Sequence, residues 1–60
     1  MFTTPELVRE AERELKQRER VYPRLVAAGK LSRQQADRQT ALQVAIIEKL
    51  REDDAAERLI

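Results

Sequence analysis

The sequence predicts an all-α protein, folded as one antiparallel helical hairpin with helices at about residues 4–28 and 33–56. The chain of 60 residues has one Gly, two Pro and one Ser, and 38% of its residues are charged. This composition is typical of long, exposed helices. Helix-capping patterns occur near Thr3 and Ser32, and Gly29 lies between the two apolar-periodic segments. We therefore treat residues 1–60 as a single domain.

The first helix can begin in either of two frames. Thr4 followed by Pro5 is typical of an N-cap with proline at the first helical position. With Thr3 as the cap, Glu6 would instead close a capping box. Both frames predict a helix that begins within the first five residues.

Pro23 interrupts the first helix, yet the apolar phase is the same on both sides of it. At about 100° per residue, seven apolar residues fall within an arc of about 100°, namely Leu7, Val8, Ala11, Leu15, Tyr22, Leu25 and Val26. Because proline deprives the Glu19 carbonyl of its donor, the helix should either kink or split there. The shared phase favours one kinked helix that ends near Ala28.

The segment after Ala28 predicts a tight turn. Gly29 is expected to end the first helix in the left-handed conformation, and Ser32 with Gln35 forms a second capping box. Only three residues, 30–32, lie between Gly29 and Arg33, so the two helices must fold back as antiparallel neighbours.

Several features of the chain predict self-association. A chain of this size buries only about 60% of the surface that its unfolded form exposes. It has no Cys and no His, which removes disulfides and almost all structural metal sites as stabilisers. The apolar residues of the second helix also span about 140°, wider than one partner helix covers. We expect a homo-oligomer, most simply a dimer that forms a four-helix bundle.

Polar residues within the apolar arcs are expected to shape this interface. Gln39 and Gln43 lie near the centre of the second arc, where amides can fix register and oligomeric state or can lie at a wet edge. Arg18 interrupts the first arc and can pair locally with Glu14 or cross to a second chain. The residues expected at the self-association surface are Leu42, Gln39, Gln43, Ile46, Ile47, Leu50, Arg18 and Tyr22.

A basic ridge runs along the first helix, opposite its apolar arc. Its members recur at spacings of three or four residues and are Arg9, Arg13, Lys16, Arg20 and Arg24. Such a ridge can bind an acidic protein or follow a phosphate backbone, or it can serve only as a solvated face. The net charge of only +1 favours an unidentified protein partner over nucleic acid, which is the alternative.

The chain offers little that could support catalysis. Ser32 has no His to activate it, and Asp53, Asp54 and Glu57 lack the loop of a calcium site. We expect a non-enzymatic binding protein with no cofactor and no metal. Its longest apolar runs are four residues, and its start has neither a basic n-region nor an apolar h-region, so we expect a cytoplasmic protein without a membrane partner.

The segment from Arg20 to Ser32, continued by residues 36–39, resembles a group of small uncharacterised bacterial and phage or prophage proteins. These share the pattern V-Y-P-x-L-V-x-x-G-x-[LM]-[ST]-x-x-x-A, which this chain carries from Val21 to Ala36. The resemblance covers about a third of the chain. It implies the hairpin turn and a phage or prophage accessory role, but no biochemical activity and no functional residues.

Overall fold

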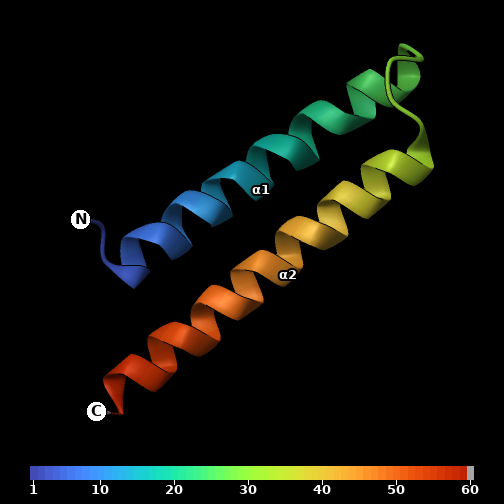
Figure 1. Ribbon diagram of the computed structural model, residues 1–60. Helices are drawn as coiled ribbons and strands as arrows, with labels where there is room; N and C mark the ends of the chain where they lie inside the picture. The colour runs from blue at the N-terminus through green and yellow to red at the C-terminus, as the bar shows by residue number, and fades with distance from the viewer. Residues whose placement is uncertain (60) are drawn as a thin grey trace.

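The computed structural model describes residues 1–59, which form two long helices joined by a short turn (Figure 1). α1 spans Thr4–Ala27 and α2 spans Arg33–Arg58. The helices run antiparallel, so that both chain ends lie at one end of the rod and the turn lies at the other. The rod measures 48 × 18 × 15 Å. The all-α hairpin is confirmed, and α2 ends slightly later than the sequence predicts.

Thr3 is the N-cap of α1. Its hydroxyl accepts a hydrogen bond from the backbone N–H of Glu6 at 3.3 Å, and the Glu6 carboxylate accepts one from the Thr3 N–H at 3.4 Å. This reciprocal pair satisfies two backbone donors that the helix itself leaves without acceptors. Of the two predicted frames, the capping-box frame is therefore the one that forms.

α1 continues through Pro23 to Ala27, so proline does not split the helix. Pro23 lies at an exposed position. The Glu19 carbonyl that loses its helical donor therefore lies on the solvent side of the helix, where water can replace that donor. Exposure explains why the helix tolerates proline here.

The turn has the geometry that its sequence predicts. Gly29 adopts a φ of 73°, and its N–H donates to the Val26 carbonyl at 3.0 Å. The next N–H, of Lys30, donates to the Leu25 carbonyl at 2.9 Å. The two bonds form the Schellman motif, in which a right-handed α-helix ends at a glycine in the left-handed conformation. Ser32 then caps α2 through a reciprocal pair with Gln35, with distances of 3.0 and 3.2 Å.

The hairpin has a thin core. Among residues 1–59, only Ala36, Gln43 and Ile47 are buried, and all three belong to α2. The radius of gyration is 14.1 Å, whereas a compact chain of this length has a value of about 10 Å and a compact chain twice as long about 14 Å. The apolar seam between the helices is therefore the whole interior of one chain.

Candidate interaction surfaces

The seam between α1 and α2 divides the surface of the hairpin into two broad faces. On one face, Glu12 and Glu19 of α1 line a shallow hollow together with Val44 and Arg51 of α2. Arg51 and Glu12 also form an ion pair of 3.1 Å across the seam. These contacts fix which edges of the two helices belong to this face.

Leu42 and Ile46 lie on the opposite face. Each is two residues from Val44, which corresponds to about 200° around an α-helix, so they project to the other side of the seam. Both keep 51% of their surface exposed, although they are large apolar residues one helical turn apart.

Neither helix within residues 1–59 is apolar enough along its length to cross a bilayer.

α1 contributes its own apolar residues to this opposite face. Val21 lines a hollow with Glu14 and Arg18, on the edge of α1 away from Glu12 and Glu19. Leu25 follows Val21 by one turn, and Leu7 precedes Glu14 by two turns, so both share this edge. Leu7 is 43% exposed. We call the whole surface the open face, and it comprises Leu7, Val21 and Leu25 of α1 with Leu42, Ile46 and Leu50 of α2.

Polar side chains form hydrogen bonds between α1 and α2 along the seam, beside the open face. The Gln43 side-chain NH₂ group donates to the Ala11 carbonyl at 2.9 Å, and Gln43 is only 6% exposed. The Tyr22 hydroxyl donates to the Gln39 side-chain carbonyl at 2.8 Å. Arg18 pairs with Glu14 within α1, with an Nε–Oε1 distance of 3.1 Å. These contacts set how α1 and α2 lie against each other.

The residues expected at the self-association surface thus lie in three different environments. Leu42, Ile46 and Gln39 are exposed, and Leu50, Arg18 and Tyr22 are half-buried. Gln43 and Ile47 are buried against α1 in a single chain. Leu7, Val21 and Leu25 belong to the open face but were absent from the expected set. Leu7 and Leu25 lie at the edge of the apolar arc of α1, which is the signal that could have indicated them.

The basic ridge is an exposed surface on α1. Arg13, Lys16 and Arg20 lie with Gln17 around a shallow hollow of about 450 Å³. Arg13 also lies 3.6 Å from Glu10. Within residues 1–59, the remaining members, Arg9, Lys16, Arg20 and Arg24, form no ion pair, so their charges are available to a partner.

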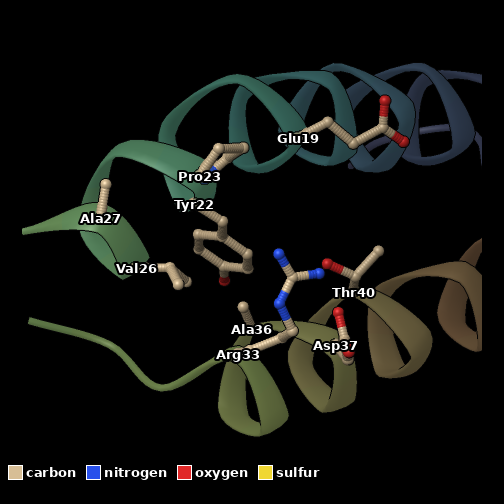
Figure 2. Close-up of a pocket in the computed structure, with 9 residues that line it drawn as sticks. All are labelled: Glu19, Tyr22, Pro23, Val26, Ala27, Arg33, Ala36, Asp37 and Thr40. Carbon is tan, nitrogen blue, oxygen red and sulfur yellow. The ribbon is translucent and has the colours of Figure 1, made fainter. Parts of the chain in front are cut away.

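A groove of about 410 Å³ lies near the turn, on the face that carries Val44. Figure 2 shows the Arg33 guanidinium directed across this groove toward the ring of Tyr22. Carboxylates and a guanidinium both contribute to it, so no single charge dominates the groove. Its lining residues are Glu19, Tyr22, Pro23, Val26, Ala27, Arg33, Ala36, Asp37 and Thr40.

Three of the carboxylates near the end of α2 each have a separate partner. Asp53 pairs with Lys49 at 3.5 Å and Asp54 with Arg58 at 3.0 Å. Glu57 accepts a hydrogen bond from the Thr4 hydroxyl at 2.9 Å, which ties the two helices together at the terminal end. Their role in the described chain is therefore to stabilise the helices.

The open face and the basic ridge differ in chemistry and in the helices that form them. The open face is apolar, whereas the ridge is cationic and lies on α1 alone. No protein-family model, curated protein or solved structure matches this chain.

Proposed function

We propose that this protein is a non-enzymatic interaction module that self-associates through the open face. The observation that carries the proposal is the exposure of Leu42 and Ile46, each at 51%. In the same chain, Ile47 is the only large apolar residue that is buried among residues 1–59. Large apolar side chains that remain in water while the core stays thin favour burial by a second chain.

The surface area of the hairpin supports the same proposal. The hairpin exposes 5126 Å², whereas a compact monomer of about its mass exposes about 4,000 Å². The excess is about 1,100 Å². A stable protein interface buries about 800 Å² on each partner. A second copy on the open face can therefore remove most of this excess without any change in the fold of the hairpin.

The surfaces outside the open face suit a second, different protein. The basic ridge is exposed and suits an acidic surface, because its cations have few internal partners to displace. The resemblance to phage and prophage proteins favours an accessory factor that binds a host protein. The absence of His and Cys leaves no ordinary nucleophile–base pair, which supports binding rather than catalysis as the activity.

Sedimentation equilibrium tests self-association directly, and we expect a dimer at micromolar concentration. Leu42 and Ile46 should both be replaced by Glu in one variant, with Ala41 and Ala45 replaced by Glu in a matched control. The control has the same spacing and the same charge change on exposed positions of α2. Burying the exposed halves of four side chains in the dimer is worth about 4 kcal/mol, so the first variant should dissociate about a thousandfold more readily.

The outcomes separate the proposal from its rivals. The control variant should keep the dimer mass and the helical circular dichroism of the parent protein. A parent protein that remains a well-folded monomer at micromolar concentration and above contradicts the proposal. Equal weakening by both variants would mean that net charge, rather than the open face, governs association.

Nucleic-acid binding through the basic ridge is the second candidate function. It is favoured by one observation, the clustering of Arg13, Lys16 and Arg20 around one hollow. Reversal of these three residues to Glu should leave the helices intact, because all three are exposed and Glu is a good helix former. Reversal of Lys30, Arg33 and Arg38 provides a control with the same change in charge.

Fluorescence anisotropy with a random DNA duplex decides between the two functions. We expect no binding tighter than roughly micromolar at physiological salt, the range of purely electrostatic association. Nanomolar binding that weakens steeply with salt, and that the ridge reversal abolishes while the control does not, would make nucleic-acid binding the better account.

A further inference from the structure

Charge is distributed unevenly along the hairpin. Residues 13–38, which include the turn, hold eight basic and three acidic residues, a net charge of +5. Residues 1–12 hold one basic and three acidic residues, and residues 39–60 hold three and five, so each of these segments carries −2. The turn end of the rod is therefore basic, and the end with both termini is acidic.

The same polarity occurs beside the open face itself. At the turn end, Arg24 lies next to Leu25 and Arg38 lies one turn before Leu42, and within residues 1–59 neither forms an ion pair. At the terminal end, Glu6 and Glu10 line one hollow with Leu7. Asp53 lies about one turn beyond Leu50, with its side chain half exposed. A partner on the open face therefore meets cations at the turn end. At the terminal end it meets carboxylates, of which Glu10 and Asp53 are partly neutralised by Arg13 and Lys49.

The apolar residues of the open face are spaced symmetrically about Ile46. Leu42 and Leu50 lie four residues before and four residues after it, and Ile46 lies at the middle of α2. A two-fold axis through Ile46 and perpendicular to the rod would place Leu42 of one copy on Leu50 of the other.

The apolar residues of α1 fit the same axis. The hydrogen bonds from Thr4 to Glu57 and from Tyr22 to Gln39, and the ion pair of Glu12 with Arg51, agree within about two residues on which levels of α1 and α2 lie side by side. The Gln43 side chain reaches along the seam from this level to the Ala11 carbonyl. By that correspondence, Leu7 lies near the level of residue 54 and Leu25 near the level of residue 36, on either side of Ile46 at nearly equal distances. The axis therefore also places Leu7 of one copy on Leu25 of the other.

We propose that two copies of this chain pair antiparallel through their open faces, about a two-fold axis near Ile46. The inference rests on the proposed self-association and adds its orientation and register. Ile46 contacts its counterpart at the centre, and Leu7 of each copy packs on Leu25 of the other at both ends. The product is a four-helix bundle in which each turn lies beside the chain ends of the second copy.

Charge selects this orientation over the parallel one. A parallel pair would bury the same leucines and isoleucines, so apolar area alone does not discriminate. It would, however, set Arg24 and Arg38 against the same cations, and Glu6 and Asp53 against the same carboxylates. The antiparallel pair sets cations against carboxylates at both ends. Because the Debye length is about 8 Å at physiological salt and the ends lie about 27 Å apart, only charges at the same end interact.

Cysteine cross-linking tests the orientation, because the chain has no Cys of its own. Three single variants are needed, Leu7→Cys, Leu25→Cys and Ile46→Cys, each treated with a short bismaleimide linker. Ile46→Cys should cross-link to itself in either orientation and so reports on self-association alone. An equilibrated mixture of Leu7→Cys and Leu25→Cys should give the mixed dimer, identified by its mass, whereas each variant alone should give little product.

Each outcome decides one of the two proposals. Efficient cross-linking of Leu7→Cys to itself and of Leu25→Cys to itself, without the mixed product, would show a parallel pair. Cross-linking at Ile46 with neither kind of end product would show another register and would also overturn the inference. Failure of Ile46→Cys to cross-link, together with a monomeric mass, would overturn self-association through the open face itself.

Added salt and charge reversal give an independent test, because each should change the dissociation constant of the dimer in opposite directions for the two orientations. Reversal of Arg24 and Arg38 to Glu should weaken the antiparallel dimer roughly tenfold, because exposed pairs are lost at both ends. Reversal of Lys16 and Arg33, which line hollows on the face that carries Val44, is the matched control and should change the dissociation constant far less. Added NaCl should weaken the parent dimer. Tighter association after the reversal, or in added salt, would mean that like charges face each other and would overturn the antiparallel arrangement.

Discussion

Replacement of Gln43 by Leu is expected to stabilise the hairpin, although it removes a buried hydrogen bond. Gln43 is 6% exposed, and its NH₂ group donates to the Ala11 carbonyl at 2.9 Å. The carbonyl also serves as the acceptor of an intrahelical bond within α1, so loss of the amide does not leave it without a donor. The substitution therefore exchanges one hydrogen bond for additional apolar contact in the seam.

The magnitude follows from two opposing effects. Loss of the hydrogen bond costs about 1 kcal/mol in the free energy of unfolding. Burial of a leucine side chain contributes about 2 kcal/mol, and the desolvation of an amide no longer opposes it. The expected gain is about 1 kcal/mol, which corresponds to a rise in melting temperature of about 4 to 8 °C for a domain of this size. Gln43→Ala, which loses both effects, should instead destabilise the protein by about 2 kcal/mol.

Thermal and urea melts followed by circular dichroism, at one fixed chain concentration, measure these changes. Gln34→Leu is the control, because Gln34 is an exposed position of α2, and this substitution should change the stability by no more than about 0.5 kcal/mol. Light scattering on a variant with both Gln39 and Gln43 replaced by Leu then tests whether these two amides restrict the oligomeric state. A loss of about 1 kcal/mol or more in Gln43→Leu would refute the reasoning, since the hydrogen bond would then outweigh the apolar contact.

Substitutions at three further positions test the local structure by the same melts. Pro23→Ala should stabilise the protein by about 2 kcal/mol, because it restores a donor for the Glu19 carbonyl, and an unchanged melt would contradict this account. Gly29→Ala should destabilise it by about 1 kcal/mol, because φ is 73° there, while Gly29→Asn should cost less. Ser32→Ala should cost about 1 kcal/mol and Ser32→Asn little, and equal losses would show that capping is not the cause.

The hairpin was predictable because its signals are local. Ser32 with Gln35, and the single glycine at position 29, each act within one helical turn, so a sequence pattern contains the whole interaction. The choice between Thr3 and Thr4 as the first cap was not predictable, since both are good N-cap residues. Two reciprocal hydrogen bonds with Glu6 decide it, and they depend on side-chain positions that the sequence pattern does not contain.

The composition of the interaction surface was only partly predictable. A helical wheel shows that Leu42, Gln43, Ile46 and Ile47 lie in one broad arc, but it does not show which part of that arc faces α1. The rotation of α2 against α1 decides this, and it buries Gln43 and Ile47 while leaving Leu42 and Ile46 in water. On α1, the wheel likewise places Leu7 and Leu25 at the edge of the apolar arc, but it does not show that they belong to the open face. Contacts across the seam, such as that of Tyr22 with Gln39, depend on a register that periodicity does not contain.

The thin core has a consequence for how the protein folds. Polar contacts, such as that of Tyr22 with Gln39, fix the register of the seam, whereas much of the apolar surface stays exposed in one chain. If the open face supplies the missing burial, folding and association are coupled, and stability must depend on chain concentration. Each tenfold dilution should then lower the apparent free energy of unfolding by about 1.4 kcal/mol per dimer. Melts at two concentrations a hundredfold apart measure this shift, and a melting temperature that does not move would show that the thin seam suffices to hold a single hairpin together.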